Sequence, residues 1–180
     1  MLVLSKMFSK KATLREYRIQ KKIHGLVPRS VPRVIGYSQG KLHMKVIRGK
    51  TLFDAIQTMS DAVLMKVIGS VMRIMFRIRK KFPDFRHNDL HLKNIMIQRI
   101  SQPVIIDFEL AGSRVRNKLY GLTRNTKPYY DTHFFLNSVY TQVFKRRKMF
   151  PKTYSWLLRV LPPGFRGGNT RFVNNYRLRV

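Results

Sequence analysis

The feature that most constrains the fold is a polar loop, "RHNDLHLKN" (86–94), set between a long apolar stretch and two short β-branched runs. The runs, "NIMIQ" (94–98) and "PVIIDF" (103–108), are close neighbours in the chain and predict a β-hairpin. The stretch before the loop predicts a buried helix, because apolar residues recur there at helical spacing, at Leu64, Ile68, Val71, Met75 and Ile78. The polar loop is therefore expected between a core helix and a hairpin.

The remaining segments predict further helices and a second hairpin. Residues 13–26 are expected to form a helix with Thr13 as its N-cap and Gly25 at its end. Residues 33–49 predict a hairpin with Gly40 in its turn. Helices are also expected at 51–59, 131–144 and 153–161. Because helices and strands are grouped along the chain instead of alternating, the predicted fold class is α+β.

Composition sets limits on the class of protein. The 180 residues are 44% hydrophobic, which is enough for one sizeable packed domain, and without cysteine they form no disulfide or thiolate metal site. The formal net charge of +29 attracts polyanions such as nucleic acid, anionic lipid or acidic protein. A compositional bias of the source genome would give the same charge, since the basic residues are spread along the whole chain.

The termini and the apolar segments give no targeting signal. "MLVLSKMF" is too short an apolar run for a signal peptide, and Lys6 interrupts it. The longest apolar region, 62–76, falls short of the roughly 20 clean residues of a membrane helix. We therefore expect a protein that is not secreted, has no transmembrane segment, and lies in the cytoplasm or with a virion.

Three polar residues of the loop and hairpin have the chemistry of phosphoryl transfer. Asp89 lies in a turn before a strand, where a carboxylate can accept the proton of a hydroxyl nucleophile. Asn94 and Asp107 lie at the outer ends of the two paired runs, so they should be neighbours. One amide oxygen and one carboxylate suit Mg²⁺, which prefers oxygen ligands. A metal site made of His87, Asp89 and His91 is an alternative, although no further ligand at metal spacing supports it.

The motifs "HNDLHLKN" and "VIIDFE" resemble the catalytic loop and the metal-binding motif of the protein-kinase-like superfamily. The resemblance implies a protein-kinase-like fold that uses ATP and Mg²⁺. It implies that His87 braces the loop, that Asp89 is the catalytic base, and that Asn94 and Asp107 hold the metal. Phe108 would then be the packing residue beside the metal-binding aspartate.

The resemblance extends over roughly residues 10 to 145. Glu16 occupies the position of the family's ion-pairing helix glutamate, and Lys6 is the candidate for its lysine partner, at a spacing that is short for the family. A surface ion pair is the alternative for Glu16. Asp131 falls where the family has an aspartate that hydrogen-bonds the backbone of the catalytic loop, and an N-cap is its alternative role.

The chain also departs from the family pattern. It contains no G-x-G-x-x-G loop, which predicts a reduced N-lobe, and Glu109 follows Asp-Phe where protein kinases have glycine. "D-L-H" and "D-F-E" are more similar to the choline-kinase, aminoglycoside-phosphotransferase and lipopolysaccharide-kinase branches. Lys93 could supply positive charge at the γ-phosphate, or it is simply solvated. The basic stretch at 111–130 suggests an acidic acceptor.

These inferences combine into two functional hypotheses. The first is a kinase-type phosphotransferase with a reduced N-lobe (1–48), a helical C-lobe (49–161) and a basic tail (162–180), acting on a protein or small polar hydroxyl, with serine or threonine favoured. The second is a weak or inactive kinase-like module that serves as a basic structural, virion or nucleic-acid-associated component. The compact, basic chain resembles the minimal kinase-like proteins that large DNA viruses encode.

Overall fold

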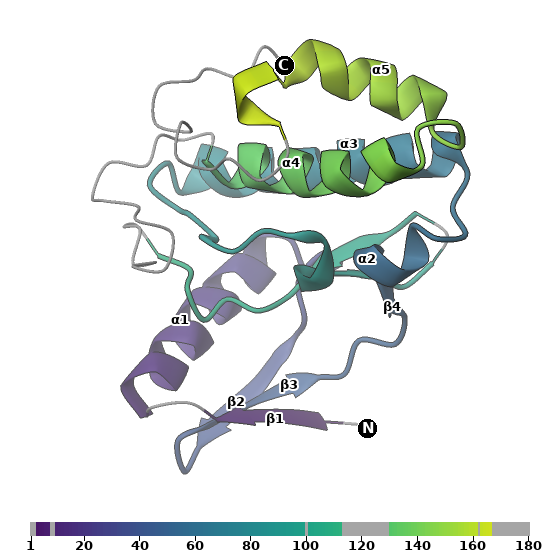
Figure 1. The fold of residues 1–180 in the computed structure, drawn as a ribbon. Helices are drawn as coiled ribbons and strands as arrows, with labels where there is room; N and C mark the ends of the chain where they lie inside the picture. Colours follow the sequence, from purple (N-terminus) through teal and green to yellow (C-terminus); the bar gives the residue numbers. More distant parts are fainter. Residues whose placement is uncertain (1–2, 8–9, 100, 113–129, 162, 167–180) are drawn as a thin grey trace.

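The computed structural model describes residues 3–7, 10–99, 101–112, 130–161 and 163–166. Most of the basic stretch at 111–130 and of the tail at 162–180 lies outside these residues. Within them, helices and two small antiparallel sheets are combined, so the α+β class is confirmed (Figure 1). None of the helices in the described ranges is long and apolar enough to cross a bilayer.

The first sheet has the strand order β1-β3-β2, with β1 at Val3–Met7, β2 at Val34–Ser38 and β3 at Lys41–Lys45. The predicted hairpin is confirmed, and its turn uses Gln39 and Gly40 with φ of 49° and 76°. Two consecutive left-handed residues match the twist of paired antiparallel strands, which explains the short connection.

Helix α1 (Lys10–Leu26) packs along this sheet (Figure 1). Two boundary predictions for it are wrong. Thr13 is fully buried inside the helix instead of capping it, and the helix passes through Gly25 to Leu26. A helical glycine costs only about 1 kcal/mol relative to alanine. The burial of Ile23 and Val27 on either side of Gly25 can offset that cost.

The second sheet holds the predicted loop-following hairpin, in the order β4-β5-β6. Strands β5 (Ile95–Ile97) and β6 (Pro103–Ile105) are paired as predicted, and β4 (Lys50–Thr51) adds an edge. Gly49 has φ of 149°, and a Cβ there would lie 2.2 Å from the Ile97 carbonyl oxygen, so glycine is required for this close approach. Helix α2 (Leu52–Ala55) is shorter than the predicted 51–59.

The helical part is built on α3 (Asp61–Lys81), with α4 (Tyr130–Lys145), α5 (Pro151–Val160) and the short η3 (Pro163–Phe165) (Figure 1). The Ser60 hydroxyl caps α3 by accepting from the Val63 N–H. All the apolar positions predicted for the core face of α3 are buried, at Leu64, Ile68, Val71, Met75 and Ile78. The core helix before the polar loop is therefore confirmed.

Candidate active site

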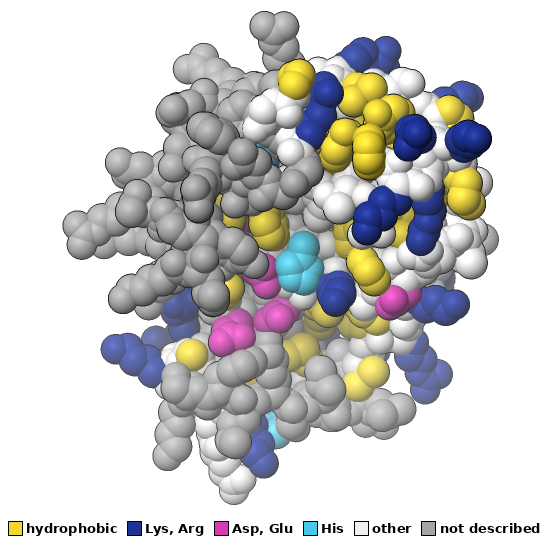
Figure 2. All heavy atoms as spheres, viewed as in Figure 1, with side chains coloured by type: hydrophobic (Ala, Val, Ile, Leu, Met, Phe, Trp, Pro, Cys, Tyr) yellow, Lys and Arg dark blue, Asp and Glu magenta, His cyan; other side chains and the backbone are white. Residues whose placement is uncertain are grey.

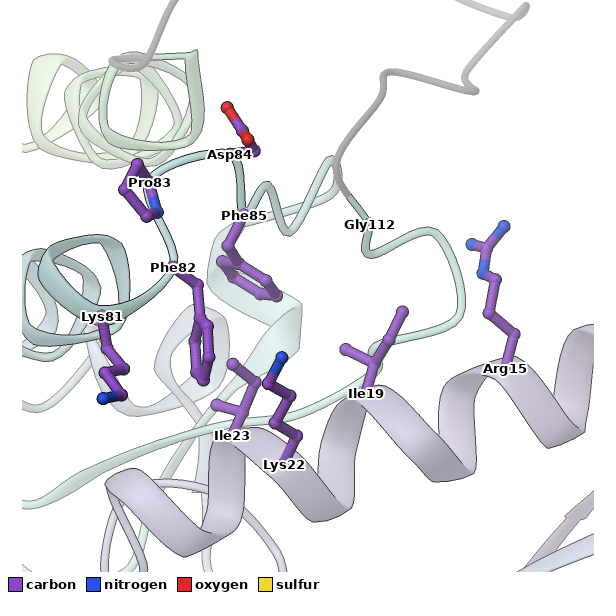
Figure 3. Close-up of a pocket in the computed structure, with 10 residues that line it drawn as sticks. All are labelled: Arg15, Ile19, Lys22, Ile23, Lys81, Phe82, Pro83, Asp84, Phe85 and Gly112. Carbon is purple, nitrogen blue, oxygen red and sulfur yellow. The ribbon is translucent and has the colours of Figure 1, made fainter.

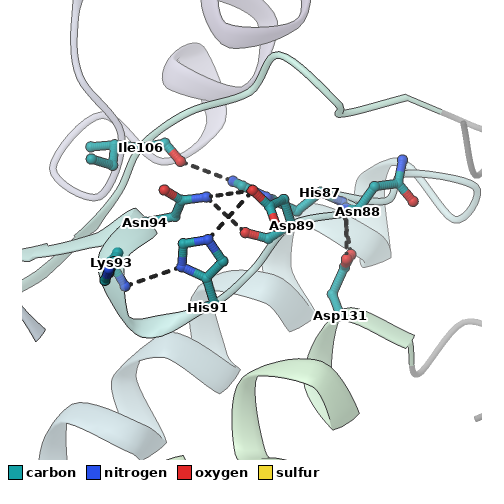
Figure 4. A network of polar contacts seen from close by, with 8 residues as sticks. All are labelled: His87, Asn88, Asp89, His91, Lys93, Asn94, Ile106 and Asp131. Atoms are coloured by element: carbon teal, nitrogen blue, oxygen red, sulfur yellow. Dashed lines mark hydrogen bonds and ion pairs between the residues drawn. The ribbon is translucent and has the colours of Figure 1, made fainter. Parts of the chain in front are cut away.

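The loop after α3 is held in place by a carboxylate from α4. Asp131 is fully buried, and its two oxygens accept the backbone N–H groups of His87 (2.8 Å) and Asn88 (2.9 Å) (Figure 4). The hydrogen bonds that the resemblance implied for Asp131 are therefore present. Asp131 lies in the first turn of α4, which begins at Tyr130. Asn88 adopts a left-handed φ of 66°, and its side chain donates to the Leu110 carbonyl.

His87 is fully buried beneath the loop. Its Nε2–H donates to the Ile106 carbonyl at 3.0 Å, and its ring lies 5.0 Å from that of Phe108. Burial lowers the pKa of His87 and outweighs the nearby carboxylates, Asp131 foremost, that act to raise it. The ring is thus a neutral brace between the loop and β6. The described residues hold no group of three or more His, Asp or Glu side chains that could bind a metal ion, so a site made of His87, Asp89 and His91 is not supported.

Asp89 is partly exposed and is held on one oxygen. Asn94 donates its Nδ2–H groups to Asp89 Oδ2 (3.0 Å) and to the Asp89 carbonyl (2.9 Å), and His91 Nε2 lies 3.5 Å from the same Oδ2 (Figure 4). Burial acts to raise the pKa of Asp89, but His91, His87 and the Asn94 hydrogen bond together hold it below its ordinary value. Asp89 is therefore a carboxylate at neutral pH, suited to accept a proton.

The position of His91 is a feature that sequence reasoning left open. The Lys93 backbone N–H donates to His91 Nδ1 at 3.2 Å. The neutral ring must then carry its proton on Nε2, the nitrogen that faces Asp89. In the sequence, only the spacing of two residues between Asp89 and His91 could have indicated that these side chains are in contact.

Asn94 and Asp107 are brought together by the β5–β6 hairpin. The register pairs Ile95 with Ile105, and the Ile106 N–H donates to the Asn94 carbonyl at 3.0 Å. In Figure 4 the amide nitrogen of Asn94 faces Asp89 and its oxygen points the other way. Asp107, the residue after Ile106, has a left-handed backbone conformation with φ of 65°. The hairpin thus places Asn94 and Asp107 at the same end of the two strands.

The other predicted site residues are Lys93, Glu16 and Lys6. Lys93 is exposed, and its ammonium lies 5.2 Å from the centroid of the Phe53 ring on α2. Glu16 is fully buried, so the surface ion pair considered for it is wrong. Lys6 lies in β1 opposite Leu42, and its side chain is outside the described part of the structure.

Arg15 is a site neighbour that sequence reasoning missed. Its Nη2 donates to the backbone carbonyls of Glu109 (2.6 Å) and Ala111 (3.0 Å), and so ties α1 to the segment that follows Asp107. No signal in the sequence could single it out, because it is one of 37 basic residues and its acceptors are backbone atoms more than ninety positions away.

On the surface, acidic side chains gather beside a histidine near the middle of one face, while Lys and Arg side chains are spread more widely (Figure 2). The chain has only 8 Asp and Glu. Asp89, Asp107 and Asp131 all act on the buried His87 ring. Much of the scarce negative charge is therefore concentrated at this loop.

Comparison with known proteins gives one informative match. No family model matches the chain. The chain is 24% identical over 181 aligned residues to "Putative serine/threonine-protein kinase R400" of Acanthamoeba polyphaga mimivirus. The alignment takes in 73% of this chain and 38% of the mimivirus protein, so the chain spans well under half the length of that relative.

Proposed function

We propose that the chain is a phosphotransferase of the protein-kinase-like type, which uses ATP and Mg²⁺ to transfer the γ-phosphoryl group to a hydroxyl acceptor, with protein serine or threonine favoured. The observation that carries the proposal is the arrangement of Asp89, Asn94 and Asp107 around one loop whose backbone is held by Asp131. The similarity to the mimivirus protein supports the same class of activity.

Asp89 is the base in this proposal. Its carboxylate accepts the proton of the acceptor hydroxyl while the hydroxyl oxygen bonds to the γ-phosphorus and ADP leaves. Asn94 and His91 both contact Oδ2, so Oδ1 is the oxygen that can face the acceptor. Because those two side chains fix the carboxylate, little reorganisation is needed when the proton moves.

Asn94 and Asp107 are the residues that fit a magnesium ion. Both offer hard oxygen donors, and the bond from Asn94 Nδ2 to Asp89 leaves the amide oxygen facing away from the base. Bound there, Mg²⁺ would neutralise the negative charge of the phosphates during transfer. The neutral, buried His87 supports this pair by fixing the Ile106 carbonyl, one residue before Asp107.

The proposal is tested by transfer of labelled γ-phosphate from ATP to protein acceptors, with and without Mg²⁺. Asp89→Asn should lower kcat by about 10²–10⁴-fold while ATP still binds, because the base is lost and the shape is kept. Asp107→Asn should weaken Mg²⁺-dependent ATP binding. Asp54→Asn is the matched control, since Asp54 is exposed on α2 and bonds to Thr51, and it should retain activity.

Three results would change the assignment. A wild-type chain that neither binds ATP nor transfers phosphate is not an enzyme of this type. Binding of ATP without transfer favours an inactive kinase-like module, which the lack of a G-x-G-x-x-G sequence already makes a specific alternative. Transfer that survives both Asp89→Asn and Asp107→Asn shows that the site is elsewhere.

A further inference from the structure

A cavity of about 740 Å³ lies between α1 and the segment that follows α3 (Figure 3). Pockets of roughly 300–1,000 Å³ hold small organic ligands in other proteins. Asp89, Asn94 and Asp107 do not line this cavity, so it is separate from the candidate active site. Its apolar walls are formed by Ile19 and Ile23 from α1 together with Phe82 and Phe85, which follow the end of α3.

The lining has an apolar floor and a cationic edge. In Figure 3 Ile19, Ile23, Phe82 and Phe85 point toward one common space. The Lys22 ammonium lies 4.2 Å from the centroid of the Phe82 ring, within that space. Among the lining residues, three are basic and one is acidic, namely Arg15, Lys22, Lys81 and Asp84. This combination suits an organic anion with an aromatic or branched apolar body, because the body is desolvated by the floor and the charge meets the cations.

Three residues of the cavity wall are in direct contact with the segments that form the candidate active site. The Phe85 ring lies 6.5 Å from that of Phe108, the neighbour of Asp107. Gly112 and Arg86 exchange two backbone hydrogen bonds, of 2.8 and 2.9 Å, immediately before His87. Arg15 donates to the carbonyls of Glu109 and Ala111. A ligand that orders these walls would therefore also order the start of the loop at Arg86 and residues 108–112, which follow Asp107.

We propose that this cavity is a regulatory site for a small organic anion with an aromatic body. When the anion is bound, it fixes residues 108–112, which follow Asp107, against the catalytic loop. The binding site stands on the cavity alone. Its effect on phosphoryl transfer rests on the proposed function, so binding and transfer are measured separately.

The probe is anilinonaphthalene sulfonate, which joins a sulfonate to two aromatic ring systems and becomes fluorescent in apolar surroundings. Titration of the folded chain should give one saturable site. Lys22→Gln should raise the Kd about tenfold, since a charge-assisted contact is lost. Lys21→Gln is the matched control, because Lys21 is exposed one position away on α1, carries the same charge and does not line the cavity. It should change the Kd less than about twofold.

Ile19→Trp tests the same site by filling it. The larger ring should occupy the space in front of Phe82 and abolish the saturable signal, with circular dichroism used to confirm that the variant is folded. If this variant does not fold, the comparison of Lys22→Gln with Lys21→Gln still decides the question, because both lysines are exposed. Equal weakening in the two lysine variants, or a signal that neither changes, overturns the site.

The coupling is tested by amide hydrogen exchange, which does not depend on activity. The N–H groups of Arg86 and Gly112 bond to each other's carbonyls, so saturation with the probe should slow their exchange at least about twofold while those of β2 and β3 stay unchanged. Unchanged exchange at Arg86 and Gly112 overturns the coupling even if the probe binds. If the chain transfers phosphate, saturation with the probe should also change the transfer rate. An unchanged transfer rate would contradict the regulatory role and would leave the binding site and the coupling in place.

Discussion

At the scale of single residues, two left-handed conformations define the candidate site. Asn88 and Asp107 have φ of 66° and 65°, a region that asparagine and aspartate enter more easily than most residues. Asn88 immediately precedes Asp89, and Asp107 is itself a proposed metal ligand. Asn88 is stabilised by its bonds to Asp131 and Leu110. Non-glycine residues in sparsely populated conformations often mark functional sites, which agrees with the assignment.

His133 on α4 should make the folded state sensitive to acid. Burial lowers its pKa from 6.5 to about 4, so the unfolded chain binds the proton more readily than the folded chain. The free energy of unfolding should therefore fall as pH drops from 6.5 toward 4, by about 3 kcal/mol in total. The buried His87 contributes in the same direction. Urea denaturation at pH 7 and near pH 4.5 measures the difference.

His133→Gln should reduce this pH dependence, because the substituted side chain does not titrate. His43→Gln is the control on β3, where the histidine is only partly buried and contacts Ser38. It should leave the difference between the two pH values nearly as large as in the wild type. If the two variants behave alike, the acid sensitivity has another origin.

At the scale of elements, α3 supplies the cap that α5 lacks. Phe150 precedes α5 and offers no side-chain hydrogen bond, while Asp61 at the start of α3 accepts the N–H groups of Lys152 (2.7 Å) and Thr153 (3.1 Å). The Thr153 hydroxyl, which is fully buried, donates to the same carboxylate. The two helices are therefore joined at their N-terminal ends, where a carboxylate is also favoured by the helix dipoles.

Asp61→Ala should lower the free energy of unfolding by about 1–2 kcal/mol, the usual effect of removing a helix cap, with a further cost for the buried hydroxyl of Thr153. Asp84→Ala removes an exposed carboxylate from a loop and should cost less than about 0.5 kcal/mol. Urea denaturation compares the two. Equal effects in both variants would show that the contact between α3 and α5 adds no stability.

At the scale of the whole molecule, charge is the dominant feature. A net charge of +29 in 180 residues places many like charges on a small surface, and their mutual repulsion destabilises the compact state. The negative charges near the candidate loop, Asp89, Asp107 and Asp131, lie within this positive field.

Screening of these positive charges by salt should therefore stabilise the folded state. Raising sodium chloride from about 0.05 M to about 0.5 M shortens the Debye length from roughly 14 to 4 Å, and the Tm should rise. The increase should be smaller in a variant in which exposed lysines far from the site, for example Lys41 and Lys45 on β3, are replaced by glutamine. A Tm that falls with salt would show that attractive ion pairs outweigh the repulsion.

Much of the fold followed from local patterns. The hairpin at β5–β6, the turn at Gly40 and the buried face of α3 were predicted because period, turn residues and capping act over a few neighbours. Helix ends were less well predicted. Thr13 looked like a cap by residue type, but it is fully buried within α1, and tertiary packing outweighs propensity at such positions.

The sequence by itself determined the α+β class and the placement of Asn94 and Asp107, since their spacing along one hairpin puts them at the same end of it. Only the tertiary structure decided which partners fix them. Asp131 reaches the loop from 43 residues away in sequence, and Arg15 reaches the segment after Asp107 from more than ninety. The cavity beside α1 is likewise formed by separate segments. Contacts of that range depend on how helices pack, which no local pattern contains.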